Sequence, residues 1–181
     1  MTFFDPRRYG AALVPLLEPL PLAGLGPGKP NGAVRDLLAS LSVERSFGQI
    51  HDRSMAQACL SGLWLLHDFL DESHAISQDI SSTTGSYWHG ILHRREPDAA
   101  NAAYWFRQVG EHPIFAALAK KAESHGLHLP SNRWSPFDFI DLCEKHRGTG
   151  AKEETLLRQV QRSEWELLFD WCFQQAIRSS Y

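Results

Sequence analysis

The chain has 181 residues, 43% of them hydrophobic and 22% charged, which is the composition of an ordinary globular protein with one sizeable core. Its formal net charge of −3 excludes the broad positive field of a general nucleic-acid-binding protein, so nucleic acid is not an expected partner. No stretch approaches the roughly 20 apolar residues of a membrane span. Prolines interrupt the apolar stretch 11–25, so we expect neither a signal peptide nor a membrane partner, and we predict a cytoplasmic location.

The three cysteines, Cys59, Cys143 and Cys172, are far apart and form no CxxC pair. Together with their apolar helical surroundings, this spacing predicts buried free thiols in a reducing compartment. A nucleophilic cysteine paired with a histidine is the alternative. We disfavour it because burial among apolar groups keeps the thiol pKa high.

Residues 1–30 are rich in proline and glycine and end in the sequence GLGPGKP. The leucines of this stretch are too numerous for a solvated linker. We therefore predict a short helix followed by an extended arm, which lies on the surface of the domain or on a partner.

From residue 31 onward the apolar residues recur with a helical period, and no run alternates with period two. Ser82 or Thr83 and then Asp98 are predicted N-caps, while Pro97 disfavours a helix at Glu96. The prediction is an all-α fold, a single domain over residues 1–181 whose residues 31–181 form an irregular bundle of six or seven helices. The expected helices span 33–41, 53–77, 84–95, 98–110, 114–125, 135–146 and 153–178.

One line of polar groups follows the second half of the expected helix 53–77. His67, Asp71 and His74 are spaced i, i+4 and i+7, and each residue of a helix advances about 100°, so they share one face. Farther upstream the same face is apolar, with Leu60 and Trp64. This pattern predicts a helix that is buried in its first half and opens onto a polar pocket in its second.

A second line lies on the expected helix 84–95, where His89 and His93 are four residues apart. The small residues beside them, Gly85, Ser86 and Gly90, would let another backbone or a ligand come close. We predict a cleft between the two helices, with His67, Asp71, His89 and His93 as catalytic groups. Histidine–carboxylate pairs can transfer protons because imidazole titrates near neutral pH.

The same residues allow a metal site. An i, i+4 histidine pair can bind one ion, and His67 with Asp71 would complete a set of three imidazoles and one carboxylate for a divalent metal such as Zn or Fe. The HExxH motif is missing. The other interpretation is a polar core in which these histidines form hydrogen bonds to carboxylates or backbone groups.

Arginines follow directly at the sequence Arg94-Arg95-Glu96-Pro97-Asp98. An arginine can hold a carboxylate or phosphate through two parallel hydrogen bonds. We predict that either Arg94 or Arg95 pairs with Glu96 or Asp98, and that the other faces the histidine cleft. The predicted ligand-binding residues are His74, Arg94, Arg95 and Arg107.

Three phrases in the centre of the chain, LWLLHDFLDESHAISQ, GSYWHGILHRREPD and NAAYWFRQVGEHP, span residues 63–113. In this order they resemble a family of uncharacterised helical proteins. The resemblance implies no established activity. It does imply that both polar lines belong to the part of the chain that the family shares.

The function that we expect from these patterns is binding or hydrolysis of a small anionic metabolite in a cleft lined by histidine, aspartate and arginine. The first alternative is a metal-dependent enzyme that uses the same histidines. The second is a non-catalytic interaction protein, whose apolar arm and long C-terminal helix pack on a partner or on a second copy to form a homo-oligomer.

Overall fold

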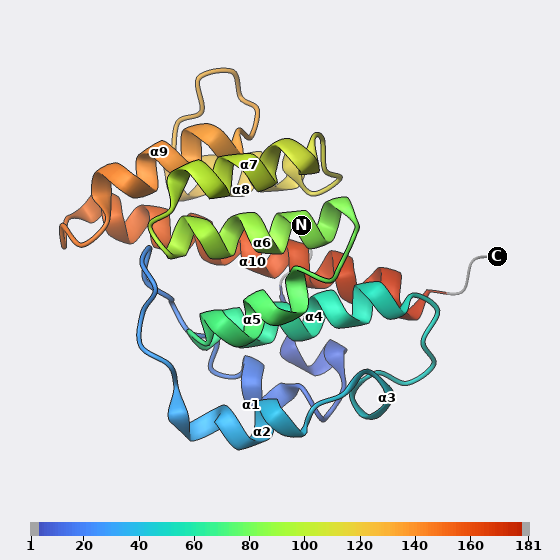
Figure 1. Cartoon of the computed structure of the whole chain (residues 1–181). Coiled ribbons are helices and arrows are strands. Elements are labelled where there is room, and N and C mark those ends of the chain that lie inside the picture. Colours follow the sequence, from blue (N-terminus) through green and yellow to red (C-terminus); the bar gives the residue numbers. More distant parts are fainter. Residues whose placement is uncertain (1–3, 179–181) are drawn as a thin grey trace.

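The computed structural model describes residues 4–178, and every regular element within them is a helix (Figure 1). The all-α prediction is therefore confirmed. Two short 3-10 helices, η1 and η2, span Pro6–Tyr9 and Gly32–Val34. The α-helices of the described residues are α1 Val14–Leu17, α2 Arg35–Ser40, α3 Val43–Ser46, α4 Arg53–Leu66, α5 Leu70–Ser77, α6 Thr83–Arg95, α7 Ala99–Val109, α8 Phe115–His125, α9 Pro136–His146 and α10 Lys152–Ile177.

The helix starts follow from side-chain caps that the sequence predicts. Ser82 accepts a hydrogen bond from the backbone N–H of Gly85 at 3.1 Å, and so starts α6. Asp98 caps α7 through the N–H of Asn101 at 3.0 Å. These oxygens satisfy backbone donors that have no partner within the helix, so each cap sets where its helix begins.

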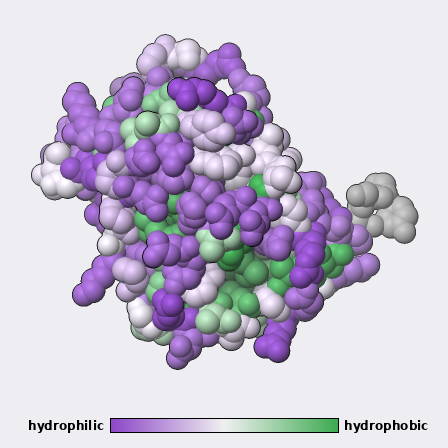
Figure 2. Space-filling view, in the orientation of Figure 1, coloured by the Kyte–Doolittle hydropathy of each residue, from purple (hydrophilic) through white to green (hydrophobic). Residues whose placement is uncertain are grey.

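The long helix α10 runs through the middle of the molecule and packs against α4, α8 and α9 (Figure 1). In that view α7, α8 and α9 lie above α6 and α10, whereas α4 and α5 lie below them. The buried apolar side chains of all these helices form one connected core. The face of the molecule that is turned to the viewer in Figure 1 is mostly hydrophilic. The exception is an apolar area below its middle, where α4 lies (Figure 2).

The predicted single helix 53–77 is wrong, because the chain turns between α4 and α5 at residues 67–69. Asp68 adopts a left-handed backbone with φ of 65°, which aspartate tolerates better than most residues. Its carboxylate pairs with the Arg95 guanidinium and accepts the N–H of Lys29 at 3.1 Å. Contacts distant in sequence therefore hold a corner that the local pattern does not indicate.

The N-terminal arm contributes to the core rather than lying on it as a surface layer. Leu13, Leu16, Leu17 and Leu25 are each at most 1% exposed. The predicted short helix is present as α1, and an extended segment follows it. The first three residues of the predicted arm lie outside the described residues.

Cys59, Cys143 and Cys172 are buried free thiols, as predicted. Burial raises the pKa of Cys143 to about 11, so this thiol is protonated at neutral pH. Among residues 4–178, the helices are all too short or too polar to cross a bilayer.

Candidate metal centre

Three imidazoles meet where α5 and α6 pack together. His74 extends from α5, while His89 and His93 come from successive turns of α6. One ring nitrogen of each lies within 4.8 Å of the other two, which is close enough for all three to bind one ion. His89 and His93 are 2% and 6% exposed, and His74 is half-buried, so the group opens to the surface on the α5 side.

Neighbouring polar groups orient two of the rings. The Ser77 hydroxyl lies 3.1 Å from Nδ1 of His89, so Nε2 of that ring is the nitrogen available to a ligand. Nδ1 of His93 lies 2.9 Å from Oε2 of Glu96. Such outer partners are typical of metal-binding histidines, because they fix the ring orientation and make the free nitrogen more basic.

The environment favours neutral imidazoles at pH 7. Burial, and after it the neighbouring His74 and His93 rings, lower the pKa of His89 to about 4. Burial likewise lowers the pKa of His93, although Glu96 opposes the change. A metal ion binds only neutral imidazole, so these two rings need not lose a proton first.

Helix α7 covers the other side of the cluster. The Trp105 ring lies 4.1 Å from the His89 ring between centroids, and the Asn101 amide nitrogen lies 3.2 Å from Nε2 of His93. Gly90 allows this close approach, because a Cβ there would lie 2.9 Å from the Phe106 ring. Of the two approaches expected at this small residue, that of another backbone and that of a ligand, the structure shows the first, because α7 packs there.

The structure does not bring together the four residues predicted as catalytic groups and metal ligands. His67 is buried elsewhere, with Nε2 at 2.9 Å from the carbonyl oxygen of Leu16. Asp71 is exposed on α5 and lies outside the cluster. The turn at Asp68 breaks the line that a continuous helix would have made. His74, predicted as a ligand-binding residue, joins His89 and His93 instead.

The expectation for the arginines is also wrong. Arg94 is fully buried, and its Nη2 donates to Oε2 of Glu164 on α10 at 2.5 Å. Arg95 pairs with Asp68 and donates to the carbonyl oxygen of Leu65 at 2.7 Å. Neither arginine therefore pairs with Glu96 or Asp98, and both are engaged away from the histidines. Arg107 is exposed on α7.

The sequence interpretation did not identify Glu96 as a partner of His93. Helix α6 ends at Arg95, as Pro97 predicts, and Glu96 is its cap residue, with φ of −73° and ψ of 10°. From this cap position its carboxylate still reaches Nδ1 of His93. The i, i+3 spacing from His93 was therefore a usable signal. Asn101 and Trp105 lie on the next helix, and only tertiary packing brings them to the rings.

Comparison of the chain with family models, curated proteins and solved structures finds no match. The resemblance of residues 63–113 to a helical family thus stays a prediction. The interpretation of the site depends on its own geometry.

Proposed function

We propose that His74, His89 and His93 bind a divalent transition-metal ion, with Zn²⁺ as the first candidate. The observation that supports this function best is the approach of three ring nitrogens to within 4.8 Å of one another. Imidazole ligands without a thiolate suit Zn, Fe and similar metals.

The chain's own residues would prepare such a site. Ser77 and Glu96 orient two rings, and Trp105 covers His89 from the α7 side. Zinc held by three histidines keeps one position open and lowers the pKa of water to about 7, which is the chemistry of hydrolysis.

The substrate class that we propose is a small anionic metabolite. Arg94 and Arg95 are occupied by Glu164 and Asp68, so they leave no guanidinium for an anion at the histidines. The positive charge that attracts the substrate would then come from the metal ion.

Metal content of the full chain, purified without a histidine tag, tests the proposal. We expect close to one equivalent of metal, or uptake of one equivalent of Zn²⁺ or Co²⁺ after dialysis. The double substitution His89→Ala with His93→Ala should abolish uptake, whereas His128→Ala on an exposed loop residue should not. A wild-type chain that takes up no metal at micromolar concentration would show that the rings form a polar core instead.

Two carboxylate variants make the test sharper. Glu96→Gln should lower Zn²⁺ affinity about 10- to 100-fold, as is typical when a ligand's outer partner is lost. The Glu96 side chain is 33% exposed, so the fold should persist. Asp71→Asn is the matched control, because this carboxylate is exposed and lies outside the cluster. Equal loss of affinity in both variants would contradict the role given to Glu96.

A further inference from the structure

Six consecutive backbone carbonyls of the arm, from Leu22 to Pro27, each accept a hydrogen bond from a side chain of the helical body. No backbone group supplies any of these six bonds. The donors and distances are Arg158 to Leu22 at 2.5 Å and to Ala23 at 3.1 Å, Gln161 to Gly24 at 2.9 Å, Arg147 to Leu25 at 3.2 Å, and Arg95 to Gly26 at 3.1 Å and to Pro27 at 3.4 Å.

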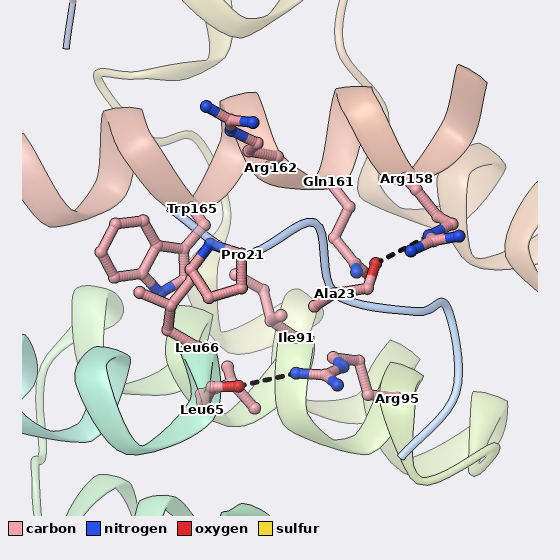
Figure 3. Close-up of a pocket in the computed structure, with 10 residues that line it drawn as sticks. All are labelled: Pro21, Ala23, Leu65, Leu66, Ile91, Arg95, Arg158, Gln161, Arg162 and Trp165. Atoms are coloured by element: carbon pink, nitrogen blue, oxygen red, sulfur yellow. Dashed lines mark hydrogen bonds between the residues drawn. The ribbon is translucent and has the colours of Figure 1, made fainter. Parts of the chain in front are cut away.

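These donors come from separate parts of the fold. Arg158 and Gln161 extend from α10, Arg147 follows α9, and Arg95 ends α6. Figure 3 shows the arm crossing between α10 and the pair α4 and α6, with Arg158 bonded to the carbonyl of Ala23. The body therefore presents a row of donors along residues 22–27 of the extended segment.

The floor beneath this segment is apolar. Leu65, Leu66, Ile91 and Trp165 line a cavity of about 20 Å³ under Pro21 and Ala23 of the arm (Figure 3). This volume is close to that of a single water molecule. The arm thus nearly fills a groove that has an apolar floor and a rim of side-chain donors.

The groove requires few particular side chains of the segment that lies in it. Leu25 is the one fully buried side chain between residues 22 and 27, at 1% exposure, and the others are half-buried or exposed. Bonds to carbonyls are available to any peptide in the same extended conformation, and recognition of this kind takes affinity from the main chain and specificity from one or two pockets.

We propose that this groove binds an extended peptide of a partner protein, and that residues 22–27 occupy it in the partner's absence. The partner segment would carry one leucine between small residues, since that is the chemistry of the segment seated there. This proposal is independent of the histidine cluster.

We expect the partner peptide to enter the groove as residues 22–27 leave it, rather than after they have left it empty. The Arg95 side chain is 2% exposed, and two of its acceptors are the arm carbonyls of Gly26 and Pro27. Buried donors without acceptors are costly, so an empty groove is unfavourable. An incoming peptide would supply the same carbonyls as the arm leaves.

The test uses the full chain with Leu25→Ala, which weakens the arm's own hold, and a fluorescent peptide with the sequence of residues 19–30. Fluorescence anisotropy should show binding to this variant at least tenfold tighter than to the wild type, whose tethered arm competes at high effective concentration. A peptide with alanine in place of its Leu25 equivalent should bind at least tenfold more weakly.

Leu20→Ala is the matched control, because Leu20 is a half-buried arm leucine outside the carbonyl row. It should behave as the wild type, and Arg158→Met added to Leu25→Ala should weaken peptide binding. Circular dichroism must show a folded variant, and Leu25→Val replaces Leu25→Ala if it does not. A folded variant that binds no peptide would overturn the proposal, and so would a chain that instead dimerises by exchanging arms.

Discussion

Arg94 and Glu164 form an ion pair in the middle of the core, and neither side chain has any exposed surface. Tyr87 donates its hydroxyl to Oε1 of Glu164 at 3.0 Å, and Gln161 lies 3.5 Å from the Arg94 guanidinium. The guanidinium also stacks on the Phe139 ring, 4.6 Å from its centroid. Each buried charge is therefore acceptable only while the other is present.

Glu164→Gln should lower the free energy of unfolding by about 3–5 kcal/mol, because it leaves the Arg94 charge buried without its counter-charge. Urea denaturation measures the change. Replacing both residues with methionine should restore much of the loss, since an apolar pair has no charge to desolvate. A single substitution that costs less than about 1 kcal/mol would mean that water or another group neutralises the arginine.

Glu166→Gln is the control on the same helix. Glu166 pairs with Arg162 at 3.1 Å, but the Arg162 side chain is 42% exposed. Exposed pairs of this kind contribute about 0.2–1 kcal/mol. Both substitutions remove one negative charge from α10, so the difference between their effects on stability measures the effect of burying the ion pair.

At the scale of the helices, the packing of α6 against α7 depends on a missing side chain. A Cβ at Gly90 would lie 2.9 Å from the Phe106 ring, which is itself buried beside Tyr87. The two helices can therefore pack at this distance only with glycine at position 90.

Gly90→Ala should destabilise the protein by about 1–2 kcal/mol in thermal denaturation, although alanine is favoured over glycine in a helix by about 1 kcal/mol. The same variant should weaken metal binding, since the Trp105 ring that covers His89 would move away from it. Ser86→Ala, at a half-buried position of the same helix, is the control and should change neither property. A Gly90→Ala chain more stable than wild type would show that Phe106 can shift freely.

Helix starts could be predicted from the sequence, because caps such as Ser82 and Asp98 are local signals. The corner at Asp68 could not be predicted, because LHDFLDES is compatible with a helix throughout. Its left-handed residue is held by Arg95 and Lys29, which lie 27 and 39 residues away.

The candidate site shows the same division. The i, i+4 pair His89 and His93 is local and could be found by spacing, whereas the position of His74 depends on how α5 packs. Arg94 could be assigned only by knowing that Glu164, 70 residues away, meets it in the core. The residue pattern of a single helix cannot show which distant charged residue will pair with it in the core.

Considered as a whole, the molecule buries four histidines whose pKa values lie below the usual range of the free side chain. Burial is the first cause for His67, His89, His93 and His112. The unfolded chain binds protons more readily at these positions. The contribution of these four rings to the free energy of unfolding should therefore be fully present above about pH 6.5, and it should decline as the pH falls toward about 4.

His112 isolates one part of this effect. Its Nδ1 accepts the N–H of Ile114 at 3.4 Å, and its Nε2 lies 3.2 Å from the Thr84 hydroxyl, an arrangement that suits a neutral ring. Burial lowers the pKa of His112 to about 4. Protonation would replace the acceptor at Nδ1 with a donor and break the bond to Ile114.

His112→Asn should therefore lower stability at pH 7 and make it less dependent on pH between 6.5 and 4.5. Urea midpoints at several pH values measure both effects. His128→Asn, at an exposed position, controls for the substitution itself. An unchanged pH dependence in the His112 variant would show that folding does not shift the pKa of this ring.

The row of carbonyl bonds along residues 22–27 also separates positions that can vary from positions that cannot. A backbone oxygen is present whatever the side chain, so Leu22 and Ala23 can be exchanged for many residues without losing a bond to Arg158. Replacing Arg158 itself removes two bonds at once. In a library of all single substitutions, tolerance should therefore be high along residues 22–27 except at Leu25, and low at the donors that hold this segment, although both belong to one contact.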